Sequence, residues 1–376
     1  MKEKVGPILF AGIILSISVV NIISPAKVFS SKENRYLEGF PKLTYKTIMS
    51  GEFSSNFEKY STDQFIGRDA WISLKTISDL AMLKKDNNRV YFGKNDYLFD
   101  VDEDINKEQF NKNMLSINKF LEKIKEYNED VGITALLVPT KSQVLEEKLP
   151  LHAPIMDENH IVEKIKSSLN DNINILNLTD TLKEHSKEDI YYKTDHHWTT
   201  KGAYYAYKHY LQQIGDTPLR ESEFIKDIAS DEFYGTSYRK ANFYRGEPDK
   251  IYSYIPKEPV KYTVDYNGVS KEEGLYDNSF LDKVDKYSYF LGGDKPLIEI
   301  DSEVRNNKTI VIVKDSFANS MIPFLINHYE KIIIIDTRYF NGSISEFIKE
   351  KDVDEVLLLY NIQNFAKEKT FSKFGL

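Results

Sequence analysis

Residues 309–335 read TIVIVKDSFANSMIPFLINHYEKIIII, and this stretch gives the clearest indication of the fold class. Its two ends, 309–313 and 331–335, are short apolar runs rich in β-branched residues, which is typical of buried strands. Between them, the spacing of apolar residues predicts a helix over 318–328. A strand, a helix and a second buried strand indicate a parallel pair in an α/β protein.

The same alternation continues on both sides of this stretch. Further apolar runs predict strands at 131–139, 173–178 and 355–360, and helical spacing predicts helices at 110–124, 161–169, 202–214 and 344–349. We therefore predict an α/β fold with a parallel sheet and helices on both faces. Residues 221–301 are rich in Tyr, Gly and Pro and alternate at 260–266, which predicts a β-rich insertion.

The first residues predict a transmembrane helix. No charged residue stands between Val5 and Ile23, and this run has about the length that a helix needs to cross a membrane. A buried core helix is the alternative, but a polar segment follows directly. The segment Ser24-Pro25-Ala26 is a poor signal-peptidase cleavage site because of its proline. We expect an uncleaved single-pass anchor in the cell membrane, with the rest of the chain extracytoplasmic.

Three regions follow from these patterns. Residues 1–26 form the predicted anchor, and 27–103 form a juxtamembrane region that packs on the core. Within that region, 53–83 has helical spacing, and 91–99 reads as two short strands around an Asn-Asp turn. Residues 104–376 form the predicted catalytic domain, which contains the insertion.

Composition excludes several classes of function. The 376 residues are 41% hydrophobic and 29% charged, so the chain can bury a substantial core. The formal charge of −8 offers no basic field for a nucleic acid, so we expect no such partner. There is no cysteine, which excludes disulfides, thiolate nucleophiles and Cys-ligated metals. The remaining chemistry must come from oxygen and imidazole groups.

Polar residues follow the predicted strands where each one ends. Ligands of an open parallel sheet bind at the carboxyl ends of its strands, and these ends share one edge. A single polar residue there is ordinary loop composition, whereas the whole set predicts a site. The residues in question are Thr140, Lys141, Asp315, Ser316, Asp336, Arg338, Tyr339 and Asn361.

Two segments carry the residue types of nucleophilic catalysis. Ser316 stands at a turn from a buried strand into a predicted helix, where a nucleophile or a plain helix N-cap would both fit. Among seven histidines, two lie in Asp195-His196-His197-Trp198. In an extended segment Asp195 and His197 project to the same side, as a base and its orienting carboxylate require. The alternative is a surface turn, which the neighbouring tryptophan makes less favourable.

Together these motifs resemble a known family. The segments YYKTDHHWT (191–199), KDSFANS (314–320) and DTRYF (336–340) are similar to those of the DHHW-motif family, as are 33–35, 67–69, 93–94 and 290–296. This family resembles the alginate O-acetyltransferases, which have SGNH/GDSL-hydrolase-like folds. The resemblance implies Ser316 as nucleophile, His197 as base and Asp195 as its orienting partner. It also implies an oxyanion role for Asn361 and a substrate- or intermediate-stabilising role for Arg338 and Tyr339; Lys141 is a further substrate-binding candidate from its strand-end position.

The implied activity is an O-acetyltransferase that acts through an acyl-serine and needs no metal or organic cofactor. The implied acceptor is a cell-surface polysaccharide, and the implied supplier of acetyl groups is a membrane-bound O-acyltransferase. Three alternatives stay open. They are an acetylesterase with the same triad, a metal-dependent phosphoesterase with Asp195, His196 and His197 as ligands, and a non-catalytic polysaccharide-binding protein.

Overall fold

The computed structural model describes residues 2–30, 35–102, 104–242, 246–266, 268, 271–272 and 274–374. Glu33 and Asn34, in one of the motif segments, lie outside the described residues. The chain divides into two compact units. The first is Met1–Asn88 with Tyr238–Arg245, and the second is Arg89–Ser237 with Gly246–Leu376.

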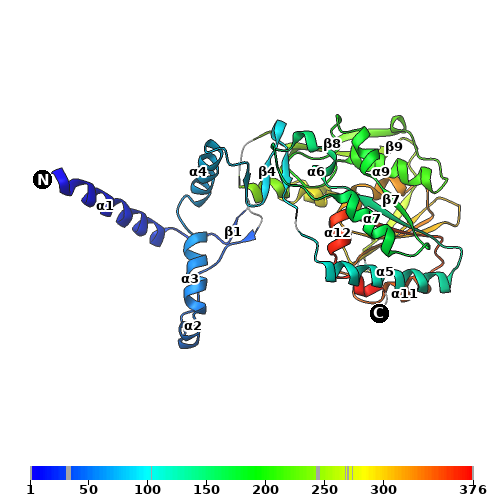
Figure 1. The fold of residues 1–376 in the computed structure, drawn as a ribbon, viewed down its shortest axis with the longest axis horizontal. Helices are drawn as coiled ribbons and strands as arrows, with labels where there is room; N and C mark the ends of the chain where they lie inside the picture. Colours follow the sequence, from blue (N-terminus) through cyan, green and yellow to red (C-terminus); the bar gives the residue numbers. More distant parts are fainter. Residues whose placement is uncertain are drawn as a thin grey trace. The chain divides into compact units, whose positions relative to one another are not determined.

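The first unit is helical. Its helix α1 (Lys2–Ile23) contains the run Val5–Ile23, whose 19 residues have a mean hydropathy of 2.2 and are long and apolar enough to cross a membrane. The predicted helical region 53–83 is two helices, α3 (Glu52–Asp63) and α4 (Arg68–Ala81), which diverge from a common turn (Figure 1). Gly67 precedes α4 with φ 64°, a left-handed conformation that favours glycine and reverses the chain there. The remaining elements are β1 (Phe29–Ser30), β2 (Arg35–Tyr36), α2 (Tyr45–Met49) and β3 (Asp86–Asn87).

The second unit is built on an eight-stranded sheet of order β11-β10-β12-β14-β13-β15-β6-β7. Its parallel part consists of β6 (Gly132–Val138), β7 (Asn174–Asn177), β13 (Thr309–Lys314), β14 (Lys331–Asp336) and β15 (Glu355–Asn361). Val313 lies beside Ile335 on one neighbour and Leu358 on the other, so these strands end level with one another. The predicted parallel α/β sheet is confirmed.

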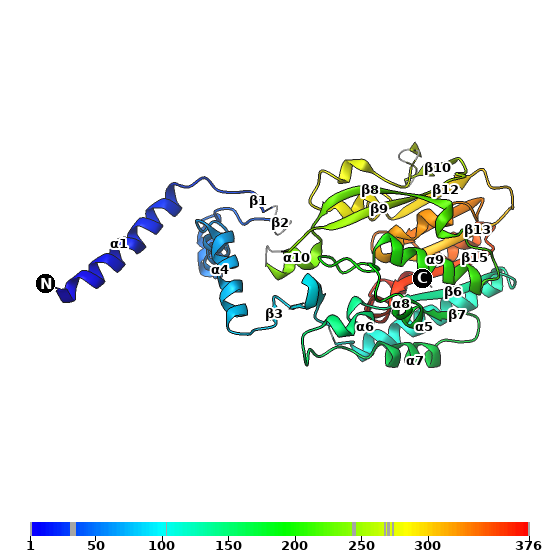
Figure 2. The same ribbon diagram turned by 90° about the horizontal axis from the view of Figure 1, so that it is seen from above.

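Helices cover both faces of this sheet (Figure 2). Alternate residues of one strand feed opposite layers: Ile310 and Ile312 pack with one cluster, Val311 and Val313 with the other. The first layer contains α6 (Lys141–Val144), α8 (Thr179–Glu184) and α9 (Thr200–Gln213). The second layer contains α5 (Lys107–Tyr127), α7 (Glu158–Ser168), α11 (Ile344–Lys349) and α12 (Ile362–Lys367).

The predicted β-rich insertion is also confirmed, and it enlarges the sheet. β12 (Leu297–Ser302) pairs antiparallel with β14, and β10 (Tyr262–Asp265) and β11 (Lys271–Glu272) continue outward from it. A separate antiparallel pair is formed by β8 (Phe224–Phe233) and β9 (Asp249–Pro256), with α10 (Thr236–Ala241) between them in sequence. Outside the insertion, β4 (Val90–Phe92) and β5 (Leu98–Asp100) form the predicted pair of short strands.

One predicted element is wrong. Residues 318–328 do not form an α-helix but two short 3-10 turns, Ser316–Ser320 and Ile322–Leu325. Pro323 lacks the N–H that a continuous helix would use, and it stands in the first turn of the second segment, where proline is tolerated. The apolar spacing that suggested a helix reflects burial instead, because Met321, Ile322 and Leu325 are fully buried.

Candidate active site

Ser316 begins the turn that follows β13. Asp315, not Ser316, caps this turn, because its carboxylate accepts the Phe317 N–H at 2.9 Å. The other oxygen of Asp315 accepts the Asn361 N–H at 2.9 Å and the Asn364 side-chain amide at 2.8 Å. The capping alternative for Ser316 is therefore excluded, and its Oγ is available for another partner.

Asp195 and His197 lie on a tight loop. An antiparallel bridge between Tyr191 and Trp198 closes it, and the residues between are bent, not extended as the sequence suggested. The two side chains nevertheless meet, since Asp195 Oδ1 accepts both the His197 N–H at 3.0 Å and Nδ1 at 2.6 Å. Asp195 Oδ2 accepts the backbone N–H and the hydroxyl of Thr236, at 2.7 and 2.9 Å. Both carboxylate oxygens are thus fully engaged.

The loop and the turn meet at the His197 ring. Its Nε2 lies 2.7 Å from Ser316 Oγ, so hydrogen bonds run without a break from Asp195 through His197 to Ser316. With Nδ1–H donated to the carboxylate, Nε2 is left to accept from the serine hydroxyl. Asp195 and His197 are buried, whereas Ser316 is partly exposed. This is the arrangement that a nucleophile, a base and its orienting carboxylate require.

The environment keeps Asp195 charged and His197 neutral. Burial alone would raise the pKa of Asp195, but His196, His197 and the Thr236 hydrogen bonds hold that pKa well below its ordinary value. Burial, helped by the nearby charge of His196, lowers the pKa of His197 to about 4, although Asp195 opposes the shift. A neutral imidazole at neutral pH can accept a proton, as a general base must.

Two aromatic side chains connect His197 and its loop to the turn of Ser316. The Tyr287 ring stacks on His197 with centroids 3.9 Å apart and an interplanar angle of 5°, and its hydroxyl donates to the Ser316 carbonyl at 3.1 Å. Trp198 is fully buried, and its indole N–H reaches the Phe317 carbonyl and Ser320 Oγ. Tyr287 was not predicted, because one tyrosine among 25 carries no distinguishing local pattern.

Lys141 lies under the loop rather than in an open position. It is 4% exposed, and its ammonium donates to the carbonyls of Tyr192, Lys193 and Asp195 at 2.8, 3.3 and 2.8 Å. Burial lowers its pKa to about 8 against the pull of nearby carboxylates, among them Asp195. Three donors meet three acceptors, so Lys141 has none left for a substrate in this conformation. Its observed contacts are those of a residue that positions the loop.

Asp249 and Gly235, which were not predicted, support the loop from the insertion. The Asp249 carboxylate accepts the backbone N–H groups of Lys193 and Thr194, each at 2.8 Å. Gly235 lies so close that a Cβ at this position would stand 2.1 Å from the Cβ of Asp195. Only glycine fits such an approach, so this residue lets Thr236 reach the carboxylate.

The predicted oxyanion donor Asn361 is engaged at the end of β15. Its Nδ2 donates to the Val138 carbonyl at 3.0 Å, and its Oδ1 accepts the N–H groups of Gln363 and Asn364 at the start of α12. The side chain is therefore an N-cap and a strand bridge in this structure. A role toward an oxyanion stays a prediction.

Arg338 belongs to a charged cluster at the end of β14. Its guanidinium forms a fork with Asp336, at 2.8 and 2.5 Å, and reaches Asp294 at 2.9 Å. Asp294 also accepts from the fully buried Lys314 at 3.0 Å and from Asn319 at 3.2 Å, which ties the cluster to the turn of Ser316. This contact assigns a structural place to segment 290–296. Tyr339 is half exposed, with Arg338 5.4 Å from its ring centroid.

The acid and histidine groups of the loop also form a potential metal cluster. Ligand atoms of Asp195, His196 and His197 lie within 4.8 Å of one another. Their observed partners, however, are Thr236, Ser316 and each other. Metal ligation would break the hydrogen bond to Ser316 or the pairing of Asp195, so the donor set does not fit a resident metal.

The fold and the placement of these residues define an SGNH-hydrolase-like α/β protein. The family model described as DHHW protein matches residues 152–335, which contain the loop and the turn. The resemblance to the DHHW family that the motifs indicated is therefore confirmed. No curated protein sequence matches this chain.

Solved structures share the fold. A DHHW family protein from Eubacterium siraeum is 24% identical with a TM-score of 0.64, covering 77% of this chain and 95% of that one. Bacillus cereus PatB1, solved with a sulfonyl adduct, is 21% identical with a TM-score of 0.62, covering 75% and 97%. A looser likeness, with a TM-score of 0.47 and 12% identity, is to the O-acetyltransferase domain of Pseudomonas putida AlgJ, covering 76% and 95%.

Proposed function

We propose that this protein is an extracytoplasmic O-acetyltransferase that transfers acetyl groups to hydroxyls of a cell-surface polysaccharide through an acyl-Ser316 intermediate. The observation that carries the proposal is the hydrogen-bonded chain from Asp195 to His197 to Ser316, at 2.6 and 2.7 Å. A buried base with a partly exposed nucleophile favours acyl transfer over mere binding. The likeness to PatB1 adds support, because a sulfonyl group is an electrophile that bonds to activated nucleophiles.

The reaction runs in two balanced halves. In the first, His197 Nε2 takes the Ser316 proton while Oγ attacks the acetyl carbonyl, and the donor group then leaves with that proton. In the second, a sugar hydroxyl attacks the acetyl-serine ester, His197 takes the hydroxyl proton, and Ser316 Oγ leaves and recovers it. Asp195 keeps Nδ1 protonated and stabilises the imidazolium in both halves. The sugar gains the acetyl group that the donor loses.

A membrane anchor would set the location of this chemistry. With α1 as an uncleaved single-pass anchor, the second unit would work at the extracytoplasmic membrane surface. A membrane-bound O-acyltransferase would then supply acetyl groups to Ser316 from across the bilayer. Arg338, held by two carboxylates near the turn of Ser316, is the candidate to contact donor or acceptor.

Transfer and hydrolysis are separated by the fate of the acetyl group. The full chain in detergent would be given a chromogenic acetyl ester with and without polysaccharide-derived oligosaccharides, next to Ser316→Ala. The proposal expects acetylated oligosaccharide by mass spectrometry with the wild type and none with the variant. Acetate alone in the presence of every acceptor would identify an esterase instead. Equal turnover by both proteins, or by neither, would remove Ser316 from the mechanism.

A further inference from the structure

The first unit shows an unusual distribution of apolar side chains. Among its described residues, every Val, Leu, Ile, Met, Phe, Tyr and Trp is at least partly exposed, and Asp63, Thr76 and Asn87 are buried instead. Large exposed apolar groups are concentrated around α3 and α4, with Phe40 65%, Phe57 43%, Phe65 37%, Ile66 38% and Trp71 54% exposed. Apolar surface of this extent in one place marks a site of interaction.

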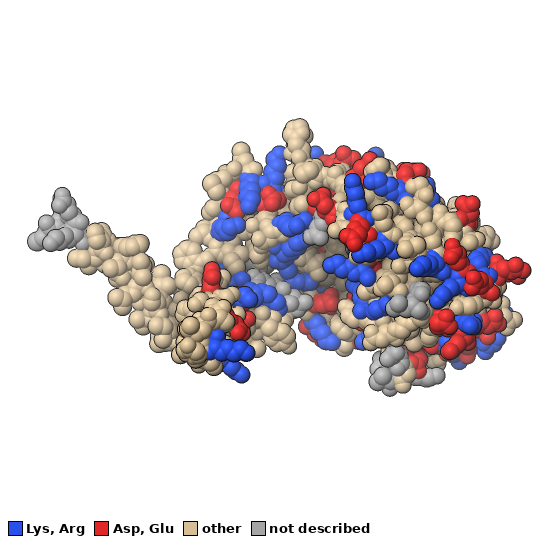
Figure 3. Space-filling model, turned by 60° about the horizontal axis from the view of Figure 1, so that its bottom comes forward, with Lys and Arg blue, Asp and Glu red and all other residues tan. Residues whose placement is uncertain are grey.

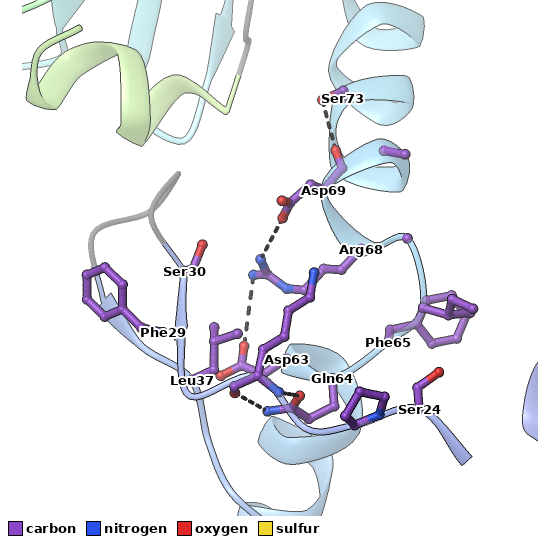
Figure 4. Close-up of a pocket in the computed structure, with 15 residues that line it drawn as sticks. Ser24, Phe29, Ser30, Leu37, Asp63, Gln64, Phe65, Arg68, Asp69 and Ser73 are labelled. Atoms are coloured by element: carbon purple, nitrogen blue, oxygen red, sulfur yellow. Dashed lines mark hydrogen bonds and ion pairs between the residues drawn. The ribbon is translucent and has the colours of Figure 1, made fainter. Parts of the chain in front are cut away.

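These side chains adjoin the end of α1. The side-chain oxygen of Asn21, in the last turn of the apolar helix, accepts the backbone N–H of Ile66 at 2.7 Å. Just after the end of α1, the backbone of Lys27 is bonded in the same way. The Gln64 side chain accepts the Lys27 N–H at 2.8 Å and donates to the Lys27 carbonyl at 2.9 Å (Figure 4). The α3–α4 turn is thus fastened to the point where α1 ends.

The same region contains an apolar pocket of about 1000 Å³. Ser18, Asn21 and Ile22 of α1 form one wall, and Phe57, Phe65 and Trp71 contribute to the rest. At about 1.5 Å per residue, Ser18 lies roughly one turn inside the end of the helix. The pocket therefore opens at the depth where a membrane-spanning α1 would pass from hydrocarbon into the headgroups.

We propose that Phe40, Phe57, Phe65, Ile66 and Trp71, here called the aromatic platform, sit in the interface of the extracytoplasmic leaflet that α1 leaves. The proposal rests on α1 being a membrane anchor, as in the proposed function. It extends that function by making the first unit a membrane-bound region of the protein, with lipid as the occupant of the pocket.

Four observations favour a bilayer as the partner. The platform is continuous with α1, whose described side chains form a surface without charge (Figure 3). Tryptophan favours the membrane interface, where its apolar ring and its polar N–H are both satisfied, and the Phe and Ile side chains of the platform supply apolar surface beside Trp71. Helix α3 is also amphipathic, with Phe53, Phe57 and Tyr60 on one stripe and Ser55 on the opposite side. Exposed Lys42 and Lys46, near the platform in sequence, would add attraction to anionic lipid.

The chain contains its own reporter. It has two tryptophans, Trp71 on the platform and Trp198, which is fully buried in the second unit. The full chain would be reconstituted into phosphatidylcholine–phosphatidylglycerol vesicles with either ordinary or brominated acyl chains. Subtracting the emission of Trp71→Phe isolates the Trp71 signal. The double variant Trp71→Phe/Ser55→Trp is the matched control, because it moves the reporter to the polar stripe of α3.

The proposal expects brominated lipid to reduce Trp71 emission at least twofold, with little quenching by aqueous iodide. The Ser55 reporter should show the reverse. Iodide quenching of Trp71 without lipid quenching would overturn the proposal, and shielding from both would overturn it by showing a protein contact. Carbonate extraction distinguishes failure of the anchor from failure of the platform. Release of the chain from the vesicles would contradict both the membrane anchor and the platform. A retained chain with water-exposed Trp71 would contradict the platform alone. Acetyl transfer is measured independently of either result.

Discussion

The loop of residues 191–199 and the turn of residues 315–320 supply the two halves of the candidate site, and they are held in different ways. The loop depends on distant segments: Lys141 after β6, Asp249 at the start of β9, and Thr236 after β8. The turn has a cap of its own, Asp315, and distant contacts from β15, Tyr287 and Trp198 add to it. A site built this way combines a nucleophile on a turn with a local cap and a base on a loop that distant segments position.

The two buried aspartates show what this difference means. Asp195 faces histidine, and its pKa is held well below the ordinary value, whereas burial of Asp315 among neutral amide donors raises its pKa. One carboxylate therefore stabilises a developing imidazolium, and the other satisfies backbone N–H groups. The chemistry therefore depends on the negative charge of Asp195, whereas Asp315 contributes as a hydrogen-bond acceptor.

The largest expected effect is the difference in kcat between variants of these two carboxylates. Asp195→Asn keeps the shape but removes the charge and the correct tautomer of His197, so we expect kcat for acetyl-ester turnover to fall about 10³–10⁴-fold. Asp315→Asn should cost less in kcat, about tenfold, because Asp315 does not contact His197; its amide N–H₂ would face the Asn361 and Asn364 donors, so a lower Tm is expected as well. Steady-state kinetics of both variants tests this, with thermal unfolding as a check on folding. Equal losses in the two variants would mean that the carboxylates do not differ in role.

The next effect concerns the close approach of the insertion to the loop. In Gly235→Ala the new methyl group would collide with Asp195, which must move away from His197. We expect a loss of about 10²-fold in kcat/KM and a lower Tm. Gly132→Ala on β6 is the control, because its added Cβ would meet only ordinary contacts at 3.8 Å. A fully active Gly235→Ala protein with an unchanged Tm would contradict the claim that the close approach of Gly235 positions Asp195.

A smaller effect is expected for Lys141. Lys141→Met leaves three loop carbonyls without their donor, which should destabilise the loop by about 1–3 kcal/mol and lower kcat about 10–100-fold. Because the ammonium does not face the substrate in this conformation, KM should change less than kcat. Lys148→Met, which removes a partly buried lysine nearby, is the control. A rise in KM with an unchanged kcat would restore the substrate-binding role predicted from the sequence.

The smallest expected effect is on pH dependence. The pKa of His197 is about 4, so the neutral base is present above that pH, and acylation should slow as the pH falls through it. Because the folded pKa lies below the unfolded one, the unfolded chain binds more protons between the two values. Stability should therefore also fall as the pH drops from about 6.5 toward 4.

His196 gives this pH dependence a specific test. The charge of His196 contributes to lowering the pKa of His197. His196→Asn should therefore move the midpoint of the acylation rate upward by less than one pH unit, which stopped-flow measurements over pH 3–8 would detect. A midpoint that stays fixed or moves downward would show that His196 does not act on His197 through its charge.

Local patterns in the sequence were sufficient for the parallel part of the sheet and for the polar residues that follow its strands. Buried strands such as Thr309–Lys314 show continuous apolar runs, and the residues after them must lie at one edge when the strands are parallel. Asp195 and His197 were identifiable because they are two residues apart. The adjacent Trp198 indicated that their turn is packed rather than at the surface.

The remaining features depend on contacts between distant segments. Lys141 reaches carbonyls about fifty residues away in sequence, and Tyr287 stacks on His197 from within the insertion. Neither contact has a local signal. The predicted helix over 318–328 failed for a similar reason, because tertiary burial produced an apolar spacing that Pro323 prevents from being one helix.

The most direct test of the account is to find the residue that carries the acyl group. The full chain would be treated with a sulfonyl fluoride and, separately, mixed rapidly with a chromogenic acetyl ester, and then examined by intact mass and peptide mapping. The account predicts one adduct per chain on the peptide containing Ser316, formed far more slowly in Asp195→Asn and absent in Ser316→Ala. An adduct on another residue, or equal labelling of Ser316→Ala, would contradict it.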